Sequence, residues 1–270
     1  MTKARRELAA RMPSQDVVIE VLDARLPGSS ANPLIAQLRR DKPCIKVLTK
    51  ADLADPVVTQ AWLAYFNGQP NTRAFASSLD RADETRARIR ELSRGLAAHR
   101  GPEKSVRALI AGVPNVGKSS LINTLMQRKV AAVSDRPAVT KQQQSVVLKD
   151  GMTLTDTPGI LWPKIVDERG AFRLALVGSI PDTAIDQLTI AMFGAQYLLD
   201  HYAALVLARF KISEVPASAE LLLNEIGRRR GALGPGGVVV LHRAAEILLN
   251  EFGAGTIGRI SLELPPTVSP

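Results

Sequence analysis

The 270-residue chain is poor in several residue types, and each scarcity excludes a class of protein. Its single cysteine, Cys44, excludes internal disulfides and clusters of thiolate metal ligands, as is typical of a reduced cytosol. Aromatic residues make up 4% of the chain, so no platform for stacking nucleic-acid bases is evident. No apolar run approaches the ~20 residues that a membrane span needs, and the basic, polar start MTKARRELAAR is not a secretory signal. We therefore expect a cytoplasmic monomer without a membrane partner.

Basic residues outnumber acidic ones, and the excess is uneven. The net charge is +9, with +11 in residues 1–164 and −2 in residues 165–270. Such an excess favours contact with nucleic-acid phosphates, although a solvated basic surface would give the same counts. A smaller basic group in the tail occupies residues 228–230. The largest basic group comprises Arg86, Arg88, Arg90, Arg94, Arg100, Lys104 and Arg107.

The run GVPNVGKSS at residues 112–120 matches the phosphate-loop pattern G-x-x-x-x-G-K-[ST]. It lies between the strand-like SVRALIAG and a stretch with apolar residues at helical spacing, which is the context that the pattern requires. Lys118 is expected to reach the β- and γ-phosphates, and the Ser119 hydroxyl to bind Mg²⁺. Backbone N–H groups at the helix start would bind further phosphate oxygens; the alternative is a glycine-rich turn of another α/β protein. The expected phosphate-loop contacts are Asn115, Val116, Gly117, Lys118, Ser119 and Ser120.

A second motif, DTPG at residues 156–159, follows the strand-like MTLT. Asp156, at a strand end, is expected to hold Mg²⁺ through water, and the Gly159 N–H to meet the γ-phosphate. Pro and Gly also mark ordinary turns, which is the alternative. Between the two motifs lies RPAVT, whose Thr140 is a candidate for the switch threonine that closes on Mg²⁺.

A third motif, TKAD, follows the apolar strand CIKVL and is expected to bind guanine through Thr49, Lys50, Ala51 and Asp52. The Asp52 carboxylate can accept hydrogen bonds from guanine N1–H and N2–H₂. Adenine lacks this donor pair and would leave a buried carboxylate unpaired. The alternative is a plain strand–turn–helix cap.

A further loop, after the short strand TRAF, contains Ala76 and Ser77. Its backbone N–H groups suit a contact to guanine O6.

Strand-like runs alternate with helical stretches in the first part of the chain. Such alternation predicts an α/β fold with a mostly parallel sheet, helices on both faces, and ligand loops at the carboxyl ends of the strands. From about residue 165 helical patterns dominate, which predicts a small all-α domain. The expected strands are 17–23, 44–48, 72–75, 105–112, 144–148 and 152–155. The expected helices are 33–40, 56–66, 81–99, 118–127, 184–199, 201–210, 217–229 and 237–252.

The order of the motifs, with TKAD before the phosphate loop and DTPG last, is that of the circularly permuted GTPases. More narrowly, the chain resembles the ribosome biogenesis GTPase A family, the YlqF type. The match lies in KARRE, VLDARLPGSSANP, KADLAD, GVPNVGKSSLIN, DRPAVT and DTPGILWPK, and continues through the tail. The resemblance implies a permuted P-loop GTPase domain over 1–164, with motif order G4-G5-G1-G2-G3, and a helical, rRNA-contacting C-terminal domain over 165–270.

The same resemblance implies a function. It implies a GTPase that converts GTP to GDP and phosphate and helps to assemble the large ribosomal subunit. The implied partners are GTP, GDP, rRNA and ribosomal proteins of a subunit precursor. Asn115 corresponds to the phosphate-loop Asn of potassium-stimulated GTPases, which implies K⁺ beside Mg²⁺.

The chain also departs from the family. Thr49 stands where the family has Asn, so we expect guanine specificity to persist and affinity to fall. Ala138 replaces a Gly before the switch residues. Met1 and Thr2 stand where the family carries a Pro-Gly-His-Met segment, whose His is the proposed water-orienting residue.

The residue that orients the attacking water therefore stays unknown. Ile160 occupies the place of the Gln in Ras-type enzymes and can neither donate nor accept a proton. We expect slow hydrolysis that the ribosome or K⁺ stimulates, or a chain that begins here at an internal methionine. Two other classes stay open: a nucleotide-switched RNA-binding protein with negligible hydrolysis, and an ATP-dependent P-loop enzyme.

Overall fold

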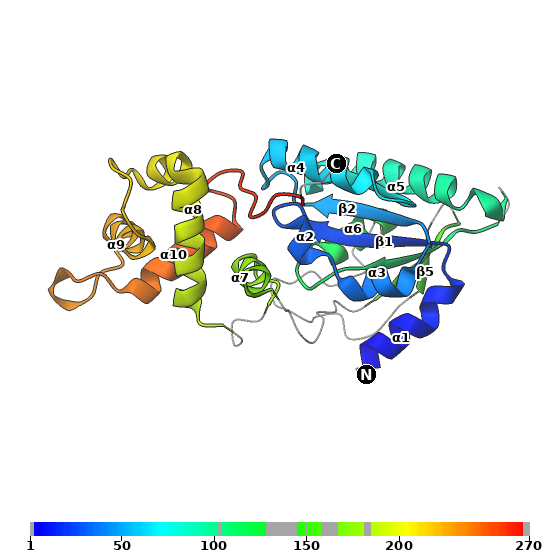
Figure 1. Cartoon of the computed structure of the whole chain (residues 1–270), viewed down its shortest axis with the longest axis horizontal. Helices are drawn as coiled ribbons and strands as arrows, with labels where there is room; N and C mark the ends of the chain where they lie inside the picture. Colours follow the sequence, from blue (N-terminus) through cyan, green and yellow to red (C-terminus); the bar gives the residue numbers. More distant parts are fainter. Residues whose placement is uncertain are drawn as a thin grey trace. The chain divides into compact units, whose positions relative to one another are not determined.

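The computed structural model describes residues 3–101, 104–127, 145–148, 151–157, 167–180 and 185–266 (Figure 1). The chain divides into two compact units. The first comprises Met1–Lys164 together with Glu263–Pro270, and the second comprises Ile165–Leu262.

The first unit is built on a six-stranded sheet with strand order β3-β2-β1-β4-β6-β5. Neighbouring strands are parallel, except that β5 runs antiparallel to β6. The α/β fold expected from strand–helix alternation is therefore confirmed. The strands are β1 (Val17–Asp23), β2 (Cys44–Thr49), β3 (Thr72–Ala76), β4 (Arg107–Ala111), β5 (Ser145–Val147) and β6 (Thr153–Asp156).

Helices cover both faces of this sheet (Figure 1). The crossovers from β1 to β2 and from β2 to β3 run in one direction across the sheet, and the crossover from β3 to β4 runs back. Right-handed crossovers therefore place α3 and α4 on one face and α5 and α6 on the other. The helices of this unit are α1 (Lys3–Arg11), α2 (Pro27–Ser30), α3 (Pro33–Arg39), α4 (Pro56–Asn67), α5 (Ala82–Leu96) and α6 (Lys118–Met126).

One face of the sheet carries two apolar clusters with an ion pair between them. Leu8 of α1 and Ile35 of α3 pack on one cluster, and Trp62 of α4 packs on the other. The Lys46 ammonium pairs with Glu20 on the adjacent strand, and Glu20 also accepts a hydrogen bond from a backbone N–H at the start of α3. Because every strand position of β1 and β2 is buried, the sequence there reads as an almost continuous apolar run.

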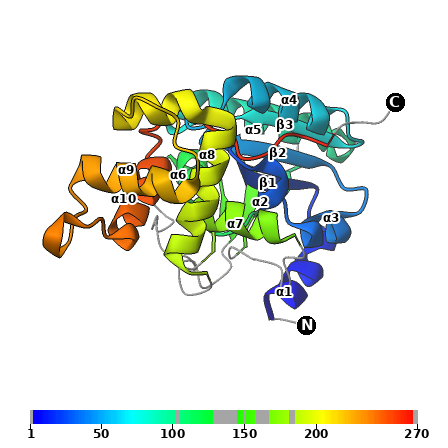
Figure 2. The same ribbon diagram turned by 60° about the vertical axis from the view of Figure 1, so that its left-hand side comes forward.

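The second unit is helical and contains α7 (Glu168–Leu176), α8 (Gln187–Phe210), α9 (Ala219–Arg230) and α10 (Leu241–Gly253). Helix α8 contacts each of the other three, and α9 packs against α10 (Figure 2). The two helices expected over 184–199 and 201–210 form this one element, which is kinked at Tyr202 with φ −138°. By length and mean hydropathy α8 alone, among the described residues, could cross a membrane, although a third of its most apolar window is buried against the protein.

The chain returns to the first unit after Leu262. The Glu263 carboxylate accepts a hydrogen bond from the Ser29 backbone N–H at 2.8 Å, and the Trp62 indole N–H donates to the Glu263 carbonyl at 3.1 Å. The helical unit therefore ends at Leu262, eight residues before the C-terminus to which the expected second domain extended.

Candidate nucleotide-binding site

The strand register brings the sequence motifs to one edge of the sheet. Asp23, the last residue of β1, lies opposite Thr49 at the end of β2. Ala76 at the end of β3 is opposite Leu48, and Asp156 at the end of β6 is opposite Ile110 of β4. In a parallel sheet all carboxyl ends face the same way, so TKAD, the loop after β3, the phosphate loop and the start of DTPG converge there.

The phosphate loop has the backbone that its glycines permit. A Cβ on Gly112 would lie 2.7 Å from the Val21 carbonyl oxygen, so only glycine allows this approach to β1. Gly117 has φ +89° immediately before α6 begins at Lys118. The loop therefore ends on the N-terminus of a nine-residue helix, where free N–H groups and the helix dipole favour anions.

Thr49 ties the guanine loop to the phosphate loop. Its side chain is buried, and its hydroxyl lies 2.8 Å from the Leu22 carbonyl oxygen and in hydrogen-bond contact with the Val116 carbonyl oxygen. A hydroxyl has one proton, so it donates to one of these carbonyls at a time. Thr49 stands where the family has Asn. The Thr49 hydroxyl thus links the two loops here in place of a longer amide side chain.

Lys50 forms a second link between these loops. Its backbone is left-handed, with φ +56°, which turns the chain after β2. The ammonium donates to the Asn115 carbonyl oxygen at 2.7 Å and lies 3.1 Å from the Asp23 carboxylate. Asn115 also has a left-handed backbone, with φ +59°. The Lys50 ammonium therefore connects two turns that both have this strained backbone conformation.

A buried ion pair between Asp23 and Arg25 holds the Lys50 ammonium in position. The Asp23 carboxylate accepts hydrogen bonds from the Arg25 guanidinium at 2.9 and 2.8 Å, in the two-pronged geometry that arginine favours. Burial alone would raise the pKa of Asp23, but the Arg25 and Lys50 cations and the Arg25 hydrogen bonds lower it well below its usual range. Asp23 is therefore ionised and orients Lys50.

Sequence reasoning assigned no role to Asp23 or Arg25. The available signal was an aspartate at the end of an apolar strand, within VLDAR, next to the strand that carries TKAD. The contact with Lys50 spans 27 positions in the chain, and only the β1–β2 register reveals it.

The two loops expected to contact the guanine base are hydrogen-bonded to each other. The Ala51 N–H donates to the Ser77 carbonyl at 3.1 Å, and the Ser77 N–H donates to the Leu48 carbonyl at 2.8 Å. The Ser77 hydroxyl shares a 2.8 Å hydrogen bond with Thr85 of α5. Asp52 is exposed in this structure and not buried as expected, so a base can reach it from solvent.

Lys118 and Asp156 face each other across the phosphate loop. The ammonium and a carboxylate oxygen are 2.5 Å apart, and both side chains are largely buried. Burial raises the pKa of Asp156, and the Lys118 charge opposes that rise. In this structure Lys118 thus pairs with the Asp156 carboxylate, the group that is expected to hold Mg²⁺ through water.

Comparison with known proteins agrees with this geometry. Residues 107–200 match the family described as 50S ribosome-binding GTPase. The ribosome biogenesis GTPase A of Bacillus cereus is 37% identical over 271 residues, which cover 98% of this chain and 92% of that protein. The chain belongs to the ribosome biogenesis GTPase A family.

Solved structures of this family share the fold. The GNP-bound YlqF of Thermotoga maritima is 29% identical, with a TM-score of 0.68 over 98% of this chain and 99% of that chain. A GDP-bound YlqF structure is 28% identical, with a TM-score of 0.70 over 96% of this chain and 99% of that chain. The permuted motif order is therefore that of a known architecture.

Of the residues expected to hold Mg²⁺, Ser119 and Asp156 lie in the described part of the chain. Ser119, which follows Lys118 in α6, and Asp156, which pairs with Lys118, carry the hard oxygen atoms that suit Mg²⁺. Among the residues that the structure describes, no cluster of three acidic, His or Cys side chains forms an all-protein metal site. Such a site fits an ion that takes its remaining ligands from phosphates and water. Thr140, Gly159 and Ile160 lie outside the described residues.

Proposed function

We propose that this protein binds GTP at the carboxyl edge of its sheet, hydrolyses it slowly, and acts in assembly of the large ribosomal subunit. The contact of Thr49 and Lys50 with the carbonyl oxygens of Val116 and Asn115 supports the proposal best, because it joins a guanine-selecting loop to a phosphate-binding loop. The relative named for ribosome biogenesis aligns over 98% of this chain, which supports extending the proposal from the site to the whole protein.

Binding uses groups that are already positioned. Backbone N–H groups of residues 115–120 and the start of α6 bind the phosphate oxygens. Lys118 exchanges the Asp156 carboxylate for those oxygens, which frees the carboxylate for a hydrated cation. The exposed Asp52 accepts hydrogen bonds from N1–H and N2–H₂ of the base. The loop that contains Ala76 and Ser77 lies near O6 in this proposal, although the Ser77 N–H already donates to the Leu48 carbonyl.

The residues that would hold cations are Ser119 and Thr140 for Mg²⁺, Asp156 for Mg²⁺ through water, and Asn115 for K⁺. When bound, these ions would neutralise the negative charge of the β- and γ-phosphates.

Hydrolysis is slow in this proposal because Ile160 cannot orient water. The specific competitor is a nucleotide switch with negligible hydrolysis of its own. Single-turnover GTP hydrolysis in KCl and in NaCl, with and without large-subunit particles, separates the two. Stimulation by particles or by K⁺ supports the GTPase; no hydrolysis under any of these conditions supports the switch.

The ribosomal role is tested by co-sedimentation with large-subunit particles. We expect more protein in the particle fraction with a non-hydrolysable GTP analogue than with GDP. Lys118→Ala is the matched control, because it removes the phosphate-binding ammonium and leaves the surface charges elsewhere unchanged. Equal sedimentation of the wild-type protein with both nucleotides would contradict a GTP-gated role.

A further inference from the structure

The segment that follows the helical unit is fixed to the loop after β1. The Glu263 carboxylate accepts two hydrogen bonds from one residue of that loop, Ser29: one from its backbone N–H at 2.8 Å and one from its hydroxyl. The Trp62 indole N–H donates to the Glu263 carbonyl at 3.1 Å, so the backbone of Glu263 is held by α4 as well. Glu263 is half-buried and comes directly after Leu262, the last residue of the helical unit.

Close packing makes this contact specific. A Cβ on Gly28 would lie 2.8 Å from the Trp62 ring and 3.0 Å from a carboxylate oxygen of Glu263. A larger residue would therefore push one of these two groups away. Trp62 is buried and has no room to move. The position of α2, which contains Gly28 and Ser29, is thus set by Glu263 on one side and by α4 on the other.

Helix α2 is bonded to the residue that orients Lys50. The Ser30 hydroxyl oxygen accepts a hydrogen bond from the Asp23 backbone N–H at 3.1 Å. The Leu26 N–H donates to the Asp23 carbonyl at 3.0 Å, and the Ser30 N–H donates to the Leu26 carbonyl at 2.9 Å. The loop to which Glu263 is fixed therefore holds both the N–H and the carbonyl of Asp23.

From Asp23 the contacts lead to both nucleotide loops. Its carboxylate lies 3.1 Å from the Lys50 ammonium, which donates to the Asn115 carbonyl of the phosphate loop at 2.7 Å. The Ala24 N–H donates to the Thr49 carbonyl of the guanine loop at 2.9 Å. A continuous series of polar contacts and short backbone steps thus runs from Glu263 through α2 to the site.

We propose that Glu263 is a positioning residue for the nucleotide site: it fixes α2, α2 fixes Asp23, and Asp23 holds Lys50 against the phosphate loop. Glu263 does not touch the nucleotide. It strengthens GTP binding because it restricts the positions that Asp23 and Lys50 take before GTP arrives, which lowers the entropy cost of binding. The inference rests on the proposed binding of GTP at the carboxyl edge.

The coupling is reciprocal. If the Glu263 contact strengthens GTP binding, GTP strengthens the Glu263 contact by the same factor. Because Glu263 directly follows the helical unit in the chain, bound GTP would fix the segment in which that unit ends.

The first test compares GTP affinity with stability in the full chain. Glu263→Ala removes both hydrogen bonds to Ser29, and we expect about fivefold weaker binding of a fluorescent GTP analogue. Asp16→Ala is the matched control. The Asp16 carboxylate also accepts one hydrogen bond from a backbone N–H, that of Arg107 at 2.8 Å, and one from a side chain, that of Arg100 at 2.7 Å. Asp16 precedes β1, so it lies at the edge of the sheet away from the nucleotide loops.

Stability alone does not explain the expected difference. A destabilised protein still binds with full affinity while nearly all molecules are folded. Asp16→Ala should therefore lose at least as much unfolding free energy in urea as Glu263→Ala, yet bind the analogue within about twofold of the wild-type protein. Equal losses of affinity in the two variants, or unchanged affinity in Glu263→Ala, would overturn the proposal.

The second test examines the route through α2. Ser30→Ala removes the hydroxyl that accepts from the Asp23 N–H. If both side chains act on Asp23 through α2, the loss of affinity in Glu263→Ala/Ser30→Ala is smaller than the product of the two single losses. A loss equal to that product would contradict the shared route.

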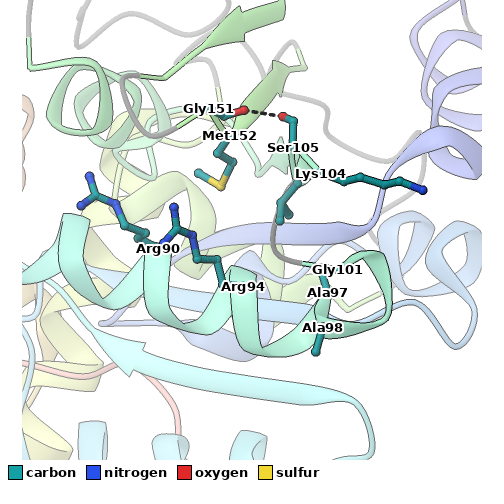
Figure 3. A pocket seen from close by; sticks show the side chains of 10 residues that line it. Arg90, Arg94, Ala97, Ala98, Gly101, Lys104, Ser105, Gly151 and Met152 are labelled. Carbon is teal, nitrogen blue, oxygen red and sulfur yellow. Dashed lines mark hydrogen bonds between the residues drawn. The ribbon is translucent and has the colours of Figure 1, made fainter.

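A serine at the opposite edge of the sheet is the control for this cycle. The Ser105 hydroxyl donates to the Gly151 carbonyl in a pocket of about 540 Å³, whose lining also includes Arg94 and Lys104 (Figure 3). The pocket lies at the amino edge, because β4 begins at Arg107 and β6 at Thr153. Ser105→Ala should leave GTP affinity unchanged, alone and combined with Glu263→Ala. A loss like that in Ser30→Ala would overturn the proposed route.

Hydrogen exchange measures the reciprocal effect. The Ser29 N–H, which donates to Glu263, should exchange more slowly when a non-hydrolysable GTP analogue is bound, and this slowing should disappear in Glu263→Ala. Exchange that the analogue leaves unchanged in the wild-type protein, or slows equally in both proteins, would overturn the proposal. A wild-type protein that binds no GTP would instead contradict the proposed function itself.

Discussion

The charged side chains compared here differ in exposure and pairing between the two edges of the same sheet. At the carboxyl edge the charged side chains beneath the loops are buried or, for Lys50, half-buried, and they are paired: Asp23 with Arg25 and Lys50, and Lys118 with Asp156. At the amino edge Arg94 and Lys104 are exposed at a pocket whose described lining contains no carboxylate.

The difference indicates which edge suits a small ligand. Paired buried charges fix the positions of a few backbone groups, which suits a small ligand with one binding geometry. Exposed cations fix no backbone group, and salt screens them. The following predictions alter one edge at a time.

Removing the Asp23 charge should have the largest effect on the carboxyl edge. Asp23→Asn removes the buried carboxylate that accepts two hydrogen bonds from the Arg25 guanidinium, and breaking a buried pair in this way costs about 3–5 kcal/mol. Urea unfolding should show this loss in the free energy of unfolding. Asp41→Asn, at an exposed position, is the control and should unfold like the wild-type protein; an equally stable Asp23→Asn would contradict the ion pair.

The same carboxylate predicts a pH dependence. The pKa of Asp23 is lower in the folded than in the unfolded state, so its stabilising contribution is full above about pH 4 and is lost as the pH falls further. The difference in unfolding free energy between the wild-type protein and Asp23→Asn should be constant from pH 7 to 5 and shrink below about pH 4. A constant difference down to pH 3 would show that Asp23 is not the titrating group.

Lys118→Ala should have the next largest effect, on nucleotide affinity. Hydrogen bonds between charged groups contribute about 1.5–3 kcal/mol, which corresponds to a roughly 10- to 100-fold weaker affinity for GTP. Titration of a fluorescent GTP analogue measures it. Lys104→Ala removes the same charge at the amino edge and should leave GTP affinity unchanged. A comparable loss in Lys104→Ala would mean that the two edges are not separate sites.

The strands and most helices of the first unit were predictable from the sequence, because apolar runs and helical spacing reflect burial directly. Val17–Asp23 is predicted and found with the same bounds. The helices α1, α2 and α7 were not predicted. Helix α1 is mostly polar and buries few side chains, Leu8 among them, and α2 is a four-residue helix, so their periodic signal is weak.

The loops of the site were predictable as motifs, but their contacts were not. Thr49 was expected to weaken nucleotide binding because it lacks an amide. Its contact with the Val116 carbonyl depends on how closely β2 and the phosphate loop approach, and the sequence does not encode that distance in any local pattern.

Thr49→Val should produce the smallest effect of this series. Valine has nearly the same shape but no hydroxyl, so the one hydrogen bond that Thr49 donates to the Leu22 or Val116 carbonyl is lost, which costs about 1 kcal/mol. GTP affinity should fall by about fivefold. Thr49→Ser, which keeps the hydroxyl, is the matched control and should bind GTP within about twofold of the wild-type protein. Equal affinities of the valine and wild-type proteins would show that the two loops do not depend on this link.

The central claim is that the carboxyl edge of the sheet selects guanine through Asp52. The most direct test measures GTP, ATP and XTP affinities side by side for the wild-type protein and Asp52→Asn. We predict that the wild-type protein prefers GTP over ATP by at least about 100-fold. We also predict that Asp52→Asn shifts the preference towards XTP, because xanthine carries a carbonyl where guanine carries the N2 amine. ATP binding as tight as GTP binding, or a preference that Asp52→Asn leaves unchanged, would contradict the account.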